Sequence, residues 1–438
     1  LQYKAPENAH NQIAHHPMTD APALAPSDPA TRPPPLIADP DFMRTWIAGG
    51  LVGVMRWMDV IVVGYYTFQV TGSATTVSYM LFMRMLPMFL LGAFCGAWSE
   101  RLDRRVILVS LLLLMTVMYS SLAVLAMRDS LELWHVAVGV TYSGIFWSFE
   151  LPVRRTMIGD ISGPARLPRA MGLESATNSI TRASGAFLGG ALLEFAGIQG
   201  PFAFGAFVCF MGAFLLAGVR RGARSESTGR EPVFASLMTG FRFIRSERVI
   251  QAVLVITIVL NLFGFACVSM LPVIGVQSFS MTALETGALT SLEGLGALCG
   301  ASLVAGFAKP AQLARIFAIG AGTYIACMGL FATMGLLGGV SLIYAAGAFL
   351  FIAGFGLSGF GSMQSGLILS RAPGNMRVRV MGVLAMCIGC GPIGILNIGW
   401  IAGTLESGAA AVVIVTSIGF TCFLLANIFY PELRRRLT

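Results

Sequence analysis

Long apolar runs dominate this 438-residue chain and restrict what it can fold into. A helix needs about 20 mostly apolar residues to cross the hydrocarbon core of a bilayer. Apolar residues make up 56% of the chain and charged residues 11%, whereas soluble domains have roughly 45–50% and about 25%. We therefore predict an all-α membrane protein with twelve transmembrane helices. The predicted spans are 46–69, 77–98, 106–127, 133–157, 169–195, 201–219, 249–271, 286–307, 313–336, 340–368, 380–404 and 409–430.

The distribution of basic residues predicts which side of the membrane each loop faces. Twelve spans place both termini on one side, and Lys and Arg are enriched in cytoplasmic loops. If the N-terminus is cytoplasmic, 25 of the 29 Lys and Arg residues lie in cytoplasmic segments and Arg128 alone lies outside. We predict a multi-pass protein of the plasma membrane, in a bacterium the inner membrane, with both termini cytoplasmic.

A polar interval after the sixth span, Arg220–Pro232, divides the chain into halves. Arg169-Ala-Met-Gly172 and Arg379-Val-Met-Gly382 open spans 5 and 11, and such weak internal similarity is typical of repeated transporter halves. We therefore predict two pseudo-symmetric six-helix bundles. The four predicted segments are a disordered cytoplasmic tail (1–45), the first bundle (46–220), a cytoplasmic linker with an amphipathic helix (221–248) and the second bundle (249–438).

The most specific motif lies between spans 2 and 3 and reads Gly96-Ala-Trp-Ser-Glu-Arg-Leu-Asp-Arg-Arg105. It resembles the signature loop of the major facilitator superfamily, Gly-x-Leu-Ala-Asp-Arg-x-Gly-Arg-Arg. Four positions match that loop, namely Gly96, Arg101, Arg104 and Arg105, while Glu100 replaces an Asp and Asp103 replaces a Gly. The resemblance implies a transporter with two bundles, in which a small-molecule substrate binds near mid-membrane and access alternates between the two sides.

Diffuse similarity over residues 41–430 narrows the resemblance. The segments Asp41–Trp46, Leu151–Arg155 and Gly287–Gly300 resemble the branch that includes enterobactin-type siderophore exporters and related efflux permeases. The resemblance implies a cytoplasmic gate in which Glu100 faces the start of span 11, where the helix dipole is positive. The predicted gate residues are Gly96, Glu100, Arg101, Asp103, Arg104, Arg105, Arg377 and Arg379.

Polar side chains within the predicted spans are the candidate site residues, because charges in lipid are costly and face a cavity or one another. They are Arg56, Asp59, Arg84, Glu174, Asn178, Arg182 and Glu293. Arg56 and Asp59 are three residues apart and share a helix face. Two interpretations stay open: a neutralised structural pair, or a cavity-lining pair in which Asp59 accepts protons. Arg84 either lines the same cavity or snorkels to the outer surface.

The polar residues of span 5 suggest a water-filled path, and Glu293 suggests a proton site. Glu174, Asn178 and Arg182 recur every four residues along span 5 and form a polar stripe. Glu150 is expected to pair with Arg154 or Arg155. Glu293 has no basic partner within the spans of its own half, and burial favours the protonated form of an unpaired carboxylate. We therefore predict proton coupling at Asp59 or Glu293.

The leading functional prediction is proton-coupled export of a small organic molecule, a siderophore or a drug-like compound. Two alternatives stay open: an uptake permease for an anionic metabolite bound by Arg56, Arg84 and Arg182, and a non-transporting membrane sensor that kept the fold. The expected partners are the lipid bilayer, the substrate and protons, with no nucleic acid and a monomeric protein.

Enzymatic and cofactor functions are not expected. The chain has no Gly-x-Ser-x-Gly or His-Glu-x-x-His pattern and no phosphate-binding Gly-x-x-x-x-Gly-Lys-Ser/Thr loop. Cys387-x-x-Cys390 lacks the second pair of Cys or His that a metal site needs. We expect no metal and no cofactor, and a proton gradient as the energy source.

Overall fold

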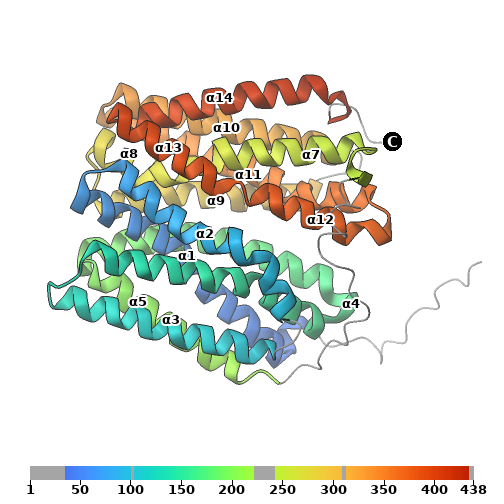
Figure 1. Cartoon of the computed structure of the whole chain (residues 1–438), viewed down its shortest axis with the longest axis horizontal. Helices are drawn as coiled ribbons and strands as arrows, with labels where there is room; N and C mark the ends of the chain where they lie inside the picture. The colour runs from blue at the N-terminus through green and yellow to red at the C-terminus, as the bar shows by residue number, and fades with distance from the viewer. Residues whose placement is uncertain (1–34, 100–102, 221–241, 308–311, 434–438) are drawn as a thin grey trace, which may run out of the picture.

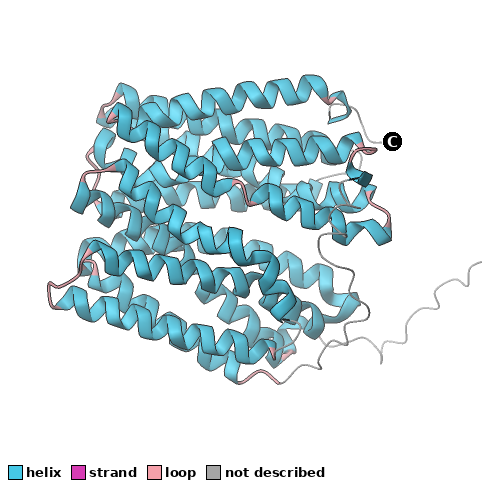
Figure 2. Ribbon diagram, in the orientation of Figure 1, coloured by secondary structure: helices cyan, strands magenta, loops and turns pink. Residues whose placement is uncertain are grey.

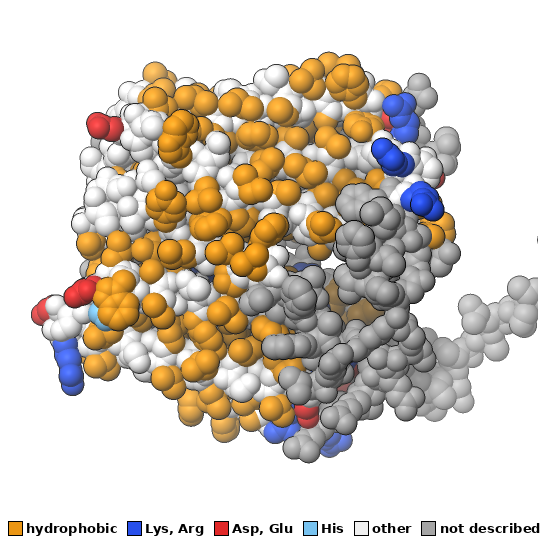
Figure 3. All heavy atoms as spheres, in the orientation of Figure 1, with side chains coloured by type: hydrophobic (Ala, Val, Ile, Leu, Met, Phe, Trp, Pro, Cys, Tyr) orange, Lys and Arg blue, Asp and Glu red, His pale blue; other side chains and the backbone are white. Residues whose placement is uncertain are grey.

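The computed structural model describes residues 35–99, 103–220, 242–307 and 312–433; for 91–99, Arg377 and Arg379 it describes the backbone alone. Helices and loops account for the described residues, which contain no strand (Figure 2). Within the described ranges, ten helices are long and apolar enough to cross a membrane. Large apolar side chains lie exposed over both halves, whereas charged ones lie mainly at the edges of the view (Figure 3). Such a surface is suited to lipid.

The first bundle contains six membrane-length segments in five helices. They are α1 (Pro40–Thr71), α2 (Ala74–Ser99), α3 (Arg104–Met127), α4 (Leu133–Ala196) and α5 (Gln199–Ala217). The 64-residue α4 holds predicted spans 4 and 5, and Gly163 separates them with a φ of 65° that is readily available to glycine. α1 begins six residues before the predicted edge because Asp39 caps it and accepts from the backbone N–H groups of Asp41 and Phe42.

The second bundle contains two interrupted spans. Its elements are α7 (Arg248–Val259), η3 (Leu260–Gly264), η4 (Phe265–Met270), α8 (Leu271–Phe279), α9 (Ala283–Phe307), α10 (Leu313–Leu337), α11 (Ile343–Arg371), α12 (Gly374–Ile388), α13 (Gly391–Leu405) and α14 (Gly408–Phe429). The segments from α7 to α8 form one span, and α12 with α13 forms another. The twelve predicted spans therefore match the observed segments within a few residues. The predicted amphipathic helix lies mostly outside the described residues.

The two bundles lie side by side, the first in blue to green and the second in yellow to red (Figure 1). They touch through α4 with α9, α2 with α13, and α1 with α8. We call the end where α1 and α3 begin and α5 ends the termini face, and the other end the opposite face.

Close contacts between the bundles gather toward the opposite face. A Cβ added to Gly190 would lie 2.3 Å from the carbonyl oxygen of Ala283, and one on Gly403 would lie 2.1 Å from Oγ1 of Thr75. The Thr75 hydroxyl also donates to the carbonyl of Gly399 at 2.9 Å. Only backbones with small residues approach so closely. The opposite face is therefore closed.

Candidate functional site

Eight charged side chains are buried or nearly buried within the described membrane spans, and each has a partner of opposite sign. The cations are Arg56, Arg84, Arg154 and Arg182, and the anions are Asp59, Glu150, Glu174 and Glu293. Their side chains are 2–12% exposed. Charges in a membrane protein face the interior and pair with one another, which this arrangement satisfies.

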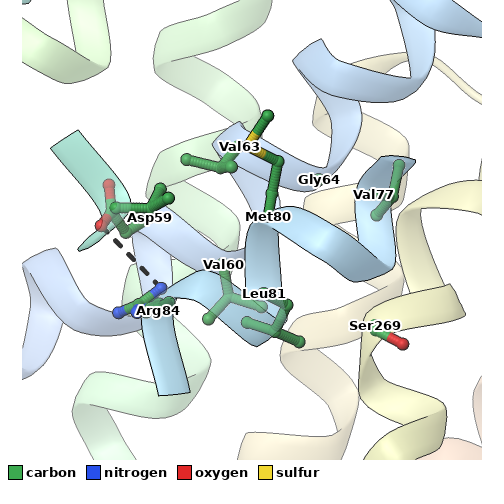
Figure 4. A pocket seen from close by; sticks show the side chains of 10 residues that line it. Asp59, Val60, Val63, Gly64, Val77, Met80, Leu81, Arg84 and Ser269 are labelled. Carbon is green, nitrogen blue, oxygen red and sulfur yellow. Dashed lines mark ion pairs between the residues drawn. The ribbon is translucent and has the colours of Figure 1, made fainter. Parts of the chain in front are cut away.

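Asp59 and Arg84 form the pair nearest to a small cavity between the bundles (Figure 4). Nη1 of Arg84 lies 3.8 Å from Oδ2 of Asp59, and Ser143 donates to the same oxygen at 3.4 Å. The cavity has a volume of about 10 Å³ and is also lined by Ser269 of the second bundle. It has room for about one water molecule. Asp59 therefore lies beside a cavity that is too small for a substrate.

Of the two interpretations of Arg56 and Asp59, the mutually neutralised pair is wrong. Arg56 Nη2 instead lies 3.0 Å from Oε2 of Glu150, and Arg84 donates to the Arg56 carbonyl at 2.9 Å. Residues three apart share a helix face, but neighbouring helices here bring a better-placed partner to each charge. Arg84 is 2% exposed, so it does not snorkel to the surface.

Glu150 is the centre of a continuous network in the first bundle. It accepts from Arg154 as well as from Arg56, which confirms the expected contact with Arg154, and Arg154 pairs in turn with Glu174. The Arg56 guanidinium lies over the ring of Trp147, 3.5 Å from its centroid. Cation–π contact of this kind stabilises a guanidinium away from water. The ion-paired network joins α1 to both halves of α4.

Arg154 was expected to pair with Glu150 but was not among the candidate site residues, because we counted it with the charges at the cytoplasmic end of its span. It is 5% exposed and contacts Glu150 and Glu174. The four-residue spacing between Glu150 and Arg154 was the available signal, since it places both on one helix face.

Arg182 and Glu293 join the two bundles. Nη2 of Arg182 lies 2.7 Å from Oε1 of Glu293, and its guanidinium lies 4.2 Å from the ring centroid of Trp57. The expectation that Glu293 is unpaired is therefore wrong. The partner comes from the other bundle, because α4 and α9 pack so closely that a Cβ on Gly294 would lie 2.5 Å from the backbone nitrogen of Ala183.

The polar stripe along α4 ends in two ion pairs. Glu174 contacts Arg154, Arg182 contacts Glu293, and Asn178 lies exposed between them. The structure therefore brings the stripe together with residues from both bundles. A continuous water path along it stays a prediction.

The gate residues are only partly described. Glu100 and Arg101 lie outside the described residues, and Gly96, Arg377 and Arg379 are described by their backbone alone. The contact of Glu100 with the start of span 11 therefore stays a prediction. Asp103 caps α3 by accepting from the Arg105 N–H at 3.0 Å. Arg104 pairs with Asp160 of α4, and Arg105 donates to the carbonyl of Ala217 at the end of α5. The described part of the loop thus ties helix ends of the first bundle together.

Two of the charges occupy equivalent places in the halves. A Cβ on Gly144 of α4 would lie 2.1 Å from the Arg84 carbonyl oxygen, and one on Gly354 of α11 would lie 1.8 Å from that of Glu293. The equivalent residues are thus about 210 positions apart, as in the repeat that opens spans 5 and 11. The pseudo-symmetry places a cation in one bundle where the other has an anion.

No group of three or more His, Cys, Asp or Glu side chains that could hold a metal occurs among the described residues. Arginine–carboxylate pairs, two tryptophans and buried amides make up the polar interior instead. Such groups suit ion-pair rearrangement and hydrogen bonding.

Comparison with known proteins decides the family. A model described as Major Facilitator Superfamily matches residues 45–395, which is most of the chain. The chain belongs to the major facilitator superfamily. This facilitator is therefore a multi-pass membrane protein.

Relatives of this facilitator are distant. The Bacillus subtilis (strain 168) protein YfiS, named as an uncharacterized transporter of this type, is 24% identical over 217 residues, covering 48% of this chain and 51% of that protein. The chain thus aligns with about half the length of this curated relative. These matches support the family and do not identify the siderophore-exporter branch.

Solved structures of low sequence identity share the fold of this facilitator. The peptide-family transporter PepTSo has a TM-score of 0.70 at 11% identity, with 90% of this chain and 98% of that chain covered. A bacterial homologue of the iron transporter ferroportin, in its inward-facing state, has a TM-score of 0.64 at 16% identity, covering 89% and 98%. A bacterial homologue of ferroportin in its outward-facing state with soaked iron has a TM-score of 0.58 at 17% identity, covering 90% and 99%.

Proposed function

We propose that this facilitator exports a small organic molecule across the bacterial inner membrane in exchange for protons. The observation that carries the proposal is the ion pair between Arg182 and Glu293, the one ion pair among the described residues that joins the two bundles. A carboxylate in that position links proton binding to the contact between the bundles.

The orientation follows from the charges at the two faces. Arg128 is the one Lys or Arg at the opposite face within the described chain, whereas the termini face carries Arg44, Arg104, Arg105 and Arg166, among others. The excess of arginine supports a cytoplasmic location of the termini face. Since the opposite face is closed, the substrate site is not open to the outside in this state, in keeping with the higher TM-score of the inward-facing ferroportin homologue.

Proton coupling follows from a difference between the two states. Glu293 forms the ion pair only when it is deprotonated and only when α4 and α9 are together. A proton on Glu293 therefore favours the state in which the bundles separate at this contact. A ligand shifts a conformational equilibrium only through such differential binding. Asp59, beside a water-sized cavity, is a second candidate for the same role.

The alternative of anion uptake is less well supported. Each of the three arginines proposed to bind an anion already contacts a carboxylate: Arg56 contacts Glu150, Arg84 contacts Asp59, and Arg182 contacts Glu293. A substrate anion would have to displace one of these groups. If uptake were correct, Arg182→Ala would abolish binding of an acid and spare its neutral analogue. A membrane sensor that kept the fold would move no candidate substrate in liposomes.

The test of the proposal uses purified protein in liposomes that contain a pH-sensitive dye. Candidate siderophores and drug-like compounds are added under an imposed pH gradient, and proton movement is recorded with substrate flux. We expect substrate-driven proton movement in the wild type, its loss in Glu293→Gln, and its retention in Glu285→Gln, an exposed carboxylate that caps α9. Substrate flux without proton movement would overturn the coupling. Loss of uptake in cells that lack the protein would reverse the assigned direction.

A further inference from the structure

The seventh span is interrupted at its centre. Between the helices α7 and α8, residues Leu260–Gly264 form a π-helical turn and Phe265–Met270 a 3₁₀ turn. π-helical and 3₁₀ turns within a span are concentrated at functional sites and hinges. Interrupted spans near mid-membrane are the places where transporters of repeated architecture bind their substrates.

A second interruption lies directly against the first. The eleventh span breaks at Gly389–Cys390, and Pro392 follows at the start of α13. A Cβ on Gly394 would lie 2.2 Å from the carbonyl oxygen of Leu262. A Cβ on Gly391 would have a single neighbour within 4 Å, Oδ1 of Asn261 at 3.9 Å. The side-chain oxygen of Asn261 is therefore directed toward the break in the neighbouring span.

Hydrogen bonds fix the orientation of two buried amides at this place. Asn261 Nδ2 lies 2.9 Å from the carbonyl of Thr257, which can only accept, so the amide nitrogen faces it. Oγ1 of Thr257 donates to the carbonyl of Val253 at 2.7 Å. The same Oγ1 must therefore accept from Nε2 of Gln364 at 2.6 Å. Both amide oxygens, Oδ1 of Asn261 and Oε1 of Gln364, are left as acceptors.

Neither oxygen has a hydrogen-bond donor among the described residues. Neither is fully buried, so both are partly accessible. The residues themselves are 6% and 7% exposed, so each oxygen is reached through a narrow opening. One turn before Gln364, a Cβ on Gly361 would meet nothing within 4 Å. There is thus free space on the helix face that carries Gln364.

No free charge accompanies these amides in the described part of the chain. Glu293, the buried acid of the second bundle, is engaged by Arg182. A ligand cation beside Asn261 and Gln364 would lack a counter-ion and would be costly to bury. A neutral hydroxyl or amide N–H would satisfy both oxygens without that cost.

We propose that Asn261 and Gln364 form the polar end of the substrate site, and that they accept hydrogen bonds from an uncharged part of the substrate that carries hydroxyl groups. The proposal rests on the transport function proposed above. The two bundles then have different roles. The first bundle supplies seven of the eight buried charges, and the second bundle supplies uncharged hydrogen-bond acceptors for the substrate.

The test measures equilibrium binding to protein in lipid nanodiscs, with no gradient present. The probes are two matched pairs of uncharged compounds: chloramphenicol with its diacetate, and 2,3-dihydroxybenzamide with 2,3-dimethoxybenzamide. In each pair the second member lacks the hydroxyl donors. We expect the wild type to prefer at least one hydroxylated member over its blocked partner by about tenfold, which corresponds to roughly one hydrogen bond.

Asn261→Leu and Gln364→Met should remove this preference. Asn427→Leu is the matched control, since Asn427 is 7% exposed and makes the same bond to the carbonyl four residues before it, but on α14. Gly361→Met fills the free space, leaves both amides intact and should weaken binding of both members of a pair. This variant keeps the test informative if an amide variant fails to fold.

Three results would overturn the proposal: no preference by the wild type in either pair, a preference that persists in both amide variants, or binding that requires a metal cation. Because binding is measured without a gradient, such a failure leaves the proton-coupling test unaffected. Conversely, loss of coupling in Glu293→Gln with an intact hydroxyl preference would separate the two proposals.

Discussion

Glu150 and Asp160 both lie on α4 and both contact arginine, but their surroundings differ. The side chain of Glu150 is 2% exposed and lies between Arg56 and Arg154, whereas that of Asp160 is 52% exposed beside Arg104. Removing one partner of a buried ion pair leaves an uncompensated charge and costs about 3–5 kcal/mol. An exposed pair contributes at most about 1 kcal/mol.

We therefore predict that Glu150→Gln lowers the thermal unfolding midpoint strongly, while Asp160→Asn has little effect. Differential scanning fluorimetry in one detergent would compare the two variants. Equal midpoints for both would show that the buried network does not stabilise the first bundle.

The cross-bundle pair allows stability to be separated from function. Arg182→Leu or Glu293→Leu alone should destabilise the protein, because the remaining charge stays buried. The double variant Arg182→Leu/Glu293→Leu should recover much of that stability, since replacing a whole buried pair by apolar groups is often neutral. Thermal midpoints would report the recovery, and dye-loaded liposomes should still show no proton coupling. If the double variant still couples substrate transport to proton movement, the Arg182–Glu293 pair is not part of the coupling mechanism.

Apart from the contact of Glu150 with Arg154, the pairing of the charges could not be read from the sequence. The residues themselves stand out, because each is polar within an apolar run. Their other partners lie on different spans, as Glu293 does 111 positions from Arg182. Only the packing of α4 on α9 decides that contact, and local spacing favoured the wrong partner for Asp59.

At the scale of the helix, two glycines hold equivalent helix pairs in contact. Gly144→Ala would place a methyl group against the carbonyl of Arg84, and Gly354→Ala against that of Glu293. The helices would have to separate, and overpacking of this kind costs about 1–3 kcal/mol or more. We expect both variants to lower the unfolding midpoint and to disturb the ion pairs of Arg84 and Glu293.

Gly172→Ala is the control for these variants. A Cβ at Gly172 meets nothing within 4 Å, and alanine is favoured over glycine in an exposed helix by up to about 1 kcal/mol. The midpoint of this variant should stay the same or rise. A fall as large as that of Gly144→Ala would attribute the effect to the backbone rather than to the contact.

Span positions were predictable because apolar length and loop charge are local properties of the chain. The interruption from Leu260 to Met270 was not, because that stretch is largely apolar and carries no period that marks a change of helix type. The interruption lies where Gly394 approaches the Leu262 carbonyl. This is a tertiary contact, which local sequence does not specify.

For the whole molecule, the closed opposite face predicts a cross-link that stops the transport cycle. Cysteines at Thr75 and Gly403, in a background without the eight native cysteines, should react with a short bifunctional maleimide. The linked protein should bind substrate from the termini face but fail to exchange it across the bilayer. Flux assays before and after linkage would measure the loss, with the single cysteine variants as controls. Full exchange after linkage would contradict alternating access through this contact.

The four buried cations and four buried anions cancel, and this balance has an electrical consequence. Moving one elementary charge through the full membrane potential is worth about 2.3 kcal/mol per 100 mV. A rocking motion that carries these paired charges together moves almost no net charge, so voltage should hardly affect the deprotonated carrier. One proton on Glu293 or Asp59 breaks the balance and makes the same motion electrogenic. The membrane voltage would then drive only the half of the cycle that carries the proton.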